Sequence, residues 1–139
     1  MMKKVILCLL LGLFSTLSFA QKDIKFKKYT LKFEEKQKFE EQLLYNLKMA
    51  TPKIFKQDVV ITKSEIIQAE KQLHLRTYYN NGFVSTSLLK KNADILSLAS
   101  TTSCTSKFCA TGGGCQPQSS NRYCTPCKKD NDCIRTTTN

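Results

Sequence analysis

Residues 73–89, LHLRTYYNNGFVSTSLL, decide how much of this chain forms sheet. Before the Asn81-Gly82 pair, every second residue is apolar or β-branched: Leu73, Leu75, Thr77 and Tyr79. Asn-Gly is the dipeptide most typical of a tight hairpin turn. A helix closed by Gly82 is the alternative, but aromatic and β-branched residues cluster here and favour strands. We therefore predict a hairpin that turns at Asn81-Gly82.

Upstream of this hairpin, residues 34–52 have the pattern of an amphipathic helix. The sequence EEKQKFEEQLLYNLKMATP places one apolar stripe at helical spacing: Phe39, Leu43, Leu47 and Ala50. Glu34 and Glu35 suit the first turn of a helix, and Pro52 blocks its continuation. The acidic pairs, including Glu40-Glu41, are expected on the solvated face of the helix, because adjacent side chains diverge too far to share one substrate atom.

Three further segments complete the predicted first domain. Residues 23–33, DIKFKKYTLKF, indicate a strand with a bulge near Lys27-Lys28, and residues 54–62, IFKQDVVIT, indicate one or two short strands. Residues 62–73 predict a second helix, because Thr62 and Glu65 have capping-box spacing. The expected fold class is α+β, a small sheet covered by one or two amphipathic helices and followed by a disulfide-rich, loop-dominated C-terminal module.

The N-terminal segment indicates export. Residues 1–20, MMKKVILCLLLGLFSTLSFA, combine two lysines, an apolar run and a small-residue cleavage site, as secretory signal peptides do. An uncleaved anchor is the alternative, but the run from Val5 to Ala20 is shorter than the roughly 20 residues that span a bilayer. We expect a signal peptide at 1–20, an α+β domain at 21–98, a linker at 99–103 and a cysteine-rich module with a short polar tail at 104–139. The expected location is secreted or periplasmic, with no transmembrane segment after signal removal.

The chain is strongly basic. It carries 22 Lys and Arg against 11 Asp and Glu, and without Lys3 and Lys4 the net charge is still +9. Outside the cytoplasm such a protein meets an anionic envelope, lipid or polysaccharide surface, or a protein partner, rather than nucleic acid. The alternative is that the dispersed lysines only keep the protein in solution.

Six cysteines lie within 30 residues at the C-terminal end: Cys104, Cys109, Cys115, Cys124, Cys127 and Cys133. An even number of cysteines in an exported chain indicates disulfides, here three. Between Cys104 and Cys133 the sizeable apolar side chains are Phe108 and Tyr123. So little apolar surface cannot offset chain entropy, and cross-links worth about 2–4 kcal/mol each would do so instead.

The pair Cys124-x-x-Cys127, CTPC, allows two other interpretations. It resembles the C-x-P-C active-site motif of the thioredoxin family, which follows a buried strand, commonly after Trp; here the preceding residues are polar and the chain has no Trp. A zinc site of Cys104, Cys109, Cys124 and Cys127 is the other, although it would leave two cysteines over. We predict disulfides in which Cys124 and Cys127 have separate partners, with no cofactor and no metal.

The residue types favour binding over catalysis. His74, the single histidine, is expected on the outward side of its element, because no motif supplies the nucleophile and acid that a catalytic histidine needs. The leading hypothesis is therefore an exported, non-enzymatic, basic, disulfide-stapled binding module. Its expected contact residues are Arg122, Tyr123, Lys128, Lys129 and Arg135.

Two other functional hypotheses stay open. The first is a precursor that releases a secreted cysteine-rich toxin or antimicrobial peptide, with Lys90-Lys91 as the cleavage site. The second is a thiol-disulfide oxidoreductase, or a zinc-binding protein, that works through Cys124 and Cys127.

Overall fold

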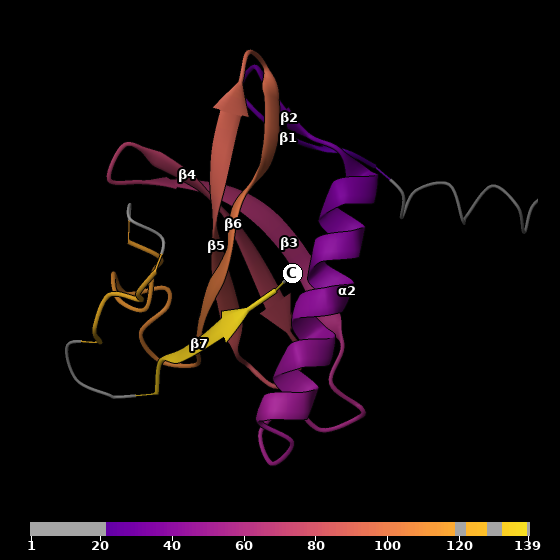
Figure 1. Ribbon diagram of the computed structural model, residues 1–139, viewed down its shortest axis with the longest axis vertical. Coiled ribbons are helices and arrows are strands. Elements are labelled where there is room, and N and C mark those ends of the chain that lie inside the picture. The colour runs from indigo at the N-terminus through magenta and orange to yellow at the C-terminus, as the bar shows by residue number, and fades with distance from the viewer. Residues whose placement is uncertain (1–21, 119–121, 128–131, 139) are drawn as a thin grey trace, which may run out of the picture.

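The computed structural model describes residues 22–118, 122–127 and 132–138. Within these residues one sheet and one helix make up the regular structure (Figure 1). The elements in chain order are β1 (Ile24–Phe26), β2 (Tyr29–Leu31), α2 (Phe33–Ala50), β3 (Ile61–Ala69), β4 (Gln72–Tyr79), β5 (Val84–Asn92), β6 (Ile95–Ser106) and β7 (Ile134–Thr137). The protein is therefore β-rich, rather than the α+β fold that was expected.

The sheet has the strand order β1-β2-β6-β5-β4-β3, and β7 also pairs with β6. The long strand β6 pairs with β5 along one edge, and its other edge is divided between two strands. Its N-terminal residues pair in parallel with β2, Leu31 opposite Leu96, and its C-terminal residues pair in antiparallel with β7, Cys104 opposite Arg135. Strand β1 contacts β3 at the far end of the order, so the sheet is nearly closed.

The predicted hairpin at residues 73–89 is confirmed. Strands β4 and β5 pair in antiparallel with Thr77 opposite Ser85, and the turn between them contains Asn81 and Gly82. Gly82 has a φ of 86°, a conformation that side chains disfavour and glycine accepts. The side-chain oxygen of Asn81 accepts a hydrogen bond from the backbone N–H of Phe83 at 3.1 Å, which closes the turn locally.

The helix predicted from residue 34 is also confirmed, as α2. Leu43 and Leu47 are fully buried, and Glu34 and Glu35 occupy the first turn. The helix ends at Ala50, and the C-cap residue Thr51 donates its hydroxyl to the Leu47 carbonyl at 2.7 Å. The amphipathic pattern therefore predicted the position of this element and the burial of Leu43 and Leu47, whereas Ala50, also assigned to the apolar stripe, is exposed.

The second predicted helix, at residues 62–73, is wrong. These residues form most of β3, the turn at Glu70-Lys71 and the start of β4. Both turn residues have positive φ, 50° and 65°, as a two-residue hairpin turn requires. The turn is built without the glycine or asparagine that usually marks it, so no residue type here signals a hairpin.

Two strand predictions also need correction. The strand with a bulge near Lys27-Lys28 is instead a short hairpin, β1 and β2, with its turn at those lysines. Most of residues 54–62 form a turn-rich connection, and β3 begins only at Ile61. The expected linker at 99–103 lies inside β6, so a continuous strand leads into the part of the chain between β6 and β7. We call the described residues of that part, 107–118, 122–127 and 132–133, the cysteine-rich segment.

The two faces of the sheet have different covers. Cross-strand partners share a face, and one row, Ser64, Thr77, Ser85 and Thr105, lies on the side of α2. The next row, Arg76, Thr86, Cys104 and Arg135, lies on the other side, where Cys104 bonds to the cysteine-rich segment. Figure 1 shows α2 and the C-terminal loops on opposite sides of the strands.

Apolar contacts form two clusters in the interior. One gathers side chains from the sheet: Leu31, Ile66, Leu73, Leu75, Leu89 and Leu96. The other joins α2 to the connection that follows it and to β4: Leu43, Leu47, Phe55, Val59 and Tyr79. The ring of Phe55 packs edge-on against Tyr79, with 5.1 Å between ring centroids. The helix is thus held to the sheet largely by the second cluster.

Candidate functional site

Three disulfides tie the cysteine-rich segment together and to the sheet. They join Cys104 to Cys124, Cys109 to Cys127, and Cys115 to Cys133, with Cα–Cα distances of 5.8, 5.7 and 5.4 Å. These distances lie within the range that disulfides adopt. The prediction of three disulfides with separate partners for Cys124 and Cys127 is confirmed, and the pairing is one that the sequence did not select.

The bridge from Cys104 to Cys124 is the one that reaches into the sheet. Cys104 lies in β6 and is fully buried, whereas Cys124 belongs to a short bridge with Pro117. The backbone of the segment is paired around it: Thr125 donates to the Gln116 carbonyl at 2.8 Å, and Cys115 donates to the Thr125 carbonyl at 3.0 Å. The segment is therefore a small cross-linked unit seated on the face opposite α2.

The sulfurs of the C-x-x-C pair are not bonded to each other. Cys127 instead bonds to Cys109, and the ligand atoms of Cys109, Cys127 and Asp132 lie within 4.8 Å of one another. A metal would need the thiolates that this disulfide consumes. In the oxidised form seen here, the cluster offers one carboxylate and no thiolate.

Asp132 holds the start of the cysteine-rich segment by hydrogen bonds. Its carboxylate accepts hydrogen bonds from the Ser106 hydroxyl at 2.7 Å and from the N–H groups of Lys107 and Phe108 at 3.0 and 3.3 Å. Partial burial raises the pKa of Asp132, but these hydrogen bonds outweigh it and hold the pKa below its usual value. The carboxylate thus stays charged and fixes the chain between β6 and Cys109.

Three of the five expected contact residues lie together at one edge of the segment. Arg122 and Tyr123 are exposed, and Arg135 projects from β7 and donates to the Arg122 carbonyl at 2.8 Å. Tyr123 is 59% exposed, high for an aromatic side chain. We call Arg122, Tyr123 and Arg135 the cationic edge. Lys128 and Lys129 lie outside the described residues.

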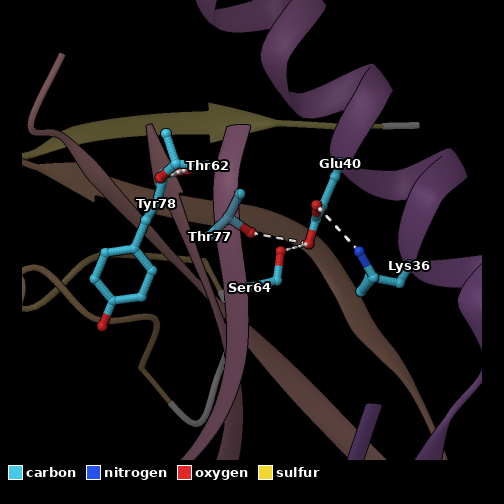
Figure 2. A network of polar contacts seen from close by, with 6 residues as sticks. All are labelled: Lys36, Glu40, Thr62, Ser64, Thr77 and Tyr78. Carbon is cyan, nitrogen blue, oxygen red and sulfur yellow. Dashed lines mark hydrogen bonds and ion pairs between the residues drawn. The ribbon is translucent and has the colours of Figure 1, made fainter. Parts of the chain in front are cut away.

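A buried carboxylate forms a second polar site, between α2 and the sheet. Glu40 is only 3% exposed, so its expected position on the solvated face of the helix is wrong. Its oxygens accept hydrogen bonds from Ser64 at 2.5 Å and Thr77 at 3.4 Å, and Lys36 lies 3.6 Å away (Figure 2). Glu40 sits beside Phe39 of the apolar stripe, and that adjacency was the available signal for its burial.

Hydroxyl groups continue this polar layer across the sheet. The Tyr79 hydroxyl lies 2.8 Å from the Ser85 hydroxyl, which lies 2.7 Å from that of Thr105, and all three side chains are buried. Burial raises the pKa of Tyr79 far above its usual value, so the phenol is neutral. These three hydroxyls join neighbouring strands, and Glu40 with Ser64 and Thr77 supplies the directional polar contact between helix and sheet.

Glu40 should make stability depend on pH. Burial raises the pKa of Glu40, and the hydrogen bond from Ser64 and the charge of Lys36 only partly oppose this. The folded state therefore binds the proton on Glu40 more tightly than the unfolded state does. The resulting stabilisation is fully present below the unfolded pKa and is lost as pH rises through the folded pKa. We expect the change in the free energy of unfolding caused by Glu40→Gln to depend on pH. Near neutral pH the variant should lose little stability or gain some, and below about pH 4.5 its loss relative to the parent chain should be largest.

Glu41→Gln is the matched control, because it removes the same charge from the exposed neighbouring position. Urea unfolding at a series of pH values gives the free energy of unfolding for both variants and the parent chain. Parallel pH curves for Glu40→Gln and Glu41→Gln would contradict the burial of the Glu40 carboxylate.

His74 lies on the other face of the sheet, and the prediction that it points outward is wrong. It is only 2% exposed, because the cysteine-rich segment covers this part of β4. Burial and the charge of Arg76 lower its pKa more than Glu70 and the Gln72 backbone raise it, so the ring is neutral at physiological pH.

Comparison with known proteins adds no relative. No protein family model, curated protein or solved structure matches this chain. Its function is therefore inferred from the residues and geometry described above.

Proposed function

We propose that this chain is an exported, non-catalytic binding protein that docks on an anionic surface through its cationic edge. Three disulfides support the exported location, because such bonds form and persist in oxidising compartments. Within the described residues, no helix has the length and apolar character to cross a membrane. The proposed role is thus contact with a surface from outside it.

The observation that carries this proposal is the rigid display of the cationic edge. Arg135 projects from β7, which pairs with β6, and Arg122 precedes Cys124, which bonds to buried Cys104. The hydrogen bond from the Arg135 guanidinium to the Arg122 carbonyl links the two supports. A binding surface that is already ordered loses less conformational entropy when it docks.

The residue types of the edge suit such a surface. Arginine presents a fork of donors that matches phosphate and carboxylate groups, and tyrosine offers an apolar ring with a polar tip. Without Lys3 and Lys4 of the signal segment the chain still carries a net charge of +9, which would attract an anionic surface over a longer range. Close contact at the edge and general attraction are separable by mutation.

Two structural facts bear on the other hypotheses. Lys90 and Lys91 lie inside β5 and pair with Ser97 and Leu96 of β6, so release of a peptide there would pull apart a pair of hydrogen-bonded strands. The bridges from Cys124 to Cys104 and from Cys127 to Cys109 differ from the internal C-x-x-C disulfide that a thioredoxin-type enzyme forms. Both facts favour the binding protein.

Neutralising the cationic edge should weaken binding to vesicles that contain phosphatidylglycerol. Each basic residue close to an anionic membrane contributes about 1 kcal/mol. The double variant Arg122→Gln/Arg135→Gln should therefore bind about thirtyfold more weakly in vesicle sedimentation at physiological salt.

The control is Lys25→Gln/Lys38→Gln, which removes the same charge from exposed positions on β1 and α2. We expect this control to lose only a few-fold. An equal loss in both double variants would mean that overall charge, and not the cationic edge, governs binding, and no loss in either would reject the electrostatic proposal.

A further inference from the structure

A pocket of about 380 Å³ lies between the β3–β4 turn and the cysteine-rich segment. Its size falls within the range of roughly 300–1,000 Å³ that small-molecule sites occupy. The polar side chains that line it come from both structures: Glu70, Gln72, His74, Gln116, Gln118 and Thr125. It does not include any residue of the cationic edge.

Both walls of the pocket are fixed by the fold. On the sheet side, Gln72 and His74 lie in β4 and pair with Ala69 and Ile67 of β3. On the other side, Gln116 and Thr125 are joined by backbone and side-chain hydrogen bonds, the latter 3.0 Å from the Gln116 N–H to the Thr125 hydroxyl. The cavity is therefore formed before any ligand arrives.

His74 is the residue that points to a ligand. Its side chain is 98% shielded from solvent and lines the pocket. The Gln72 backbone lies close enough to raise its pKa slightly, but Nδ1 makes no hydrogen bond of good geometry among the described residues. A buried polar atom left without a partner is costly, and native proteins rarely keep one without a reason. Nδ1 has almost no accessible surface in the empty pocket, so a small rotation of the ring has to bring it to the cavity, where a ligand hydroxyl would bond to it and remove this cost.

The other lining groups define the class of ligand. Glutamine amides, a threonine hydroxyl and a neutral imidazole supply both donors and acceptors, as a molecule with several hydroxyl groups requires. The charged lining residue is Glu70, which disfavours anions. Arg76 lies nearby but does not line the pocket, and one of its guanidinium nitrogens donates to the Ala110 carbonyl at 3.0 Å.

We propose that this pocket binds an uncharged saccharide, with the His74 ring bonding to a sugar hydroxyl and Gln72 and Gln116 contacting it from opposite walls. The site is separate from the cationic edge and does not depend on the proposed docking to an anionic surface. Both sites lie on the face of the sheet opposite α2, and the N–H of Gln118 in the pocket wall donates to the Tyr123 carbonyl at 3.0 Å, so the sugar site and the cationic edge are neighbours built from different side chains.

Nuclear magnetic resonance titration of the mature, disulfide-bonded chain tests the proposal. The probes are N,N′-diacetylchitobiose, maltose and cellobiose, and glucose is compared with glucuronic acid. At least one neutral disaccharide should shift the backbone amide signals of the pocket residues and the ring signals of His74 with millimolar affinity. Glucuronic acid should bind more weakly than glucose, because of Glu70.

Variants on both walls locate the binding. Gln72→Ala and Gln116→Ala should each weaken it by about two- to tenfold, the effect of one lost hydrogen bond. Gln68→Ala, an exposed position on β3 outside the pocket, should leave the affinity unchanged. Amide spectra of each variant show whether it is folded, so a loss of binding cannot be mistaken for unfolding.

Three results would overturn the proposal. The first is no shift at the pocket with any of the three disaccharides at saturating millimolar concentrations. The second is an unchanged affinity in both wall variants, and the third is tighter binding of glucuronic acid than of glucose. None of these results would affect the vesicle assay, which tests the cationic edge alone.

Discussion

Replacing Cys104 and Cys124 together by alanine is expected to lower the free energy of unfolding by about 2–4 kcal/mol. This bridge closes a loop with a sequence separation of 20 and joins buried Cys104 in β6 to the cysteine-rich segment. Without it, the segment has few apolar side chains to hold it on the sheet; Phe108 and Tyr123, its larger ones, are 66% and 59% exposed. Urea unfolding of the oxidised proteins measures the difference.

The pair Cys115→Ala/Cys133→Ala provides the comparison. Its loop has a separation of 18, so the chain-entropy contribution is nearly the same as that of the first bridge. We expect a similar loss, and any excess for the first pair measures the contact of the segment with β6. A loss below about 1 kcal/mol in both pairs would contradict a segment held by covalent cross-links.

Truncating Phe55, in the apolar cluster between α2 and the sheet, should lower the free energy of unfolding by a similar amount. Its ring is fully buried, lies among Leu43, Leu47 and Tyr79, and also packs on Phe83 with 5.5 Å between centroids. Burial of an aromatic ring at such a site means that Phe55→Ala should destabilise the fold by about 3–5 kcal/mol, through lost contacts and the cavity left behind. Thermal or urea unfolding gives the value.

The neighbour Ile54 is the matched control. It is 40% exposed, so Ile54→Ala should cost well below the loss at Phe55, on the order of 1 kcal/mol or less. Equal losses at the two positions would mean that the connection between α2 and β3 does not anchor the helix as described.

The sequence predicted the elements whose signals are local. The helix at residue 34 has apolar residues at helical spacing, glutamates in its first turn and Pro52 after its end. The hairpin at Asn81-Gly82 has the turn dipeptide that its geometry requires. The six cysteines indicated disulfides by their number. Their pairing depends on how β6 and the loops meet in space, and no spacing rule contains that information.

The errors came from turns and from burial that only the tertiary structure creates. Glu70, Lys71 and Ala93 adopt positive φ in hairpin turns, although their residue types do not indicate turns. Misreading the first of these turns produced a helix in place of β3. Small polar residues such as Ser103 suggested a linker, yet Ser103 is buried in β6 and its hydroxyl lies 2.8 Å from that of Ser87.

Of the candidate sites, one has a local signal in the sequence and the others exist only through tertiary contacts. The cationic edge was visible as basic and aromatic residues beside cysteines, whereas the His74 pocket requires β4 and Gln116 to meet across more than 40 positions of sequence. Glu40 was assigned to solvent because of where its partners lie: Ser64 is in a segment predicted as a helix, and Thr77 is in a strand whose position relative to α2 the sequence does not give.

Peptide mapping of the natively secreted protein, alkylated before and after reduction, tests the stapled segment itself. We expect no cysteine of residues 104–133 to react before reduction and all six to react after it. The non-reduced digest should contain the linked pairs Cys104–Cys124, Cys109–Cys127 and Cys115–Cys133. Free thiols in the secreted protein, or a bond between Cys124 and Cys127, would contradict a segment stapled to the sheet by these three bridges.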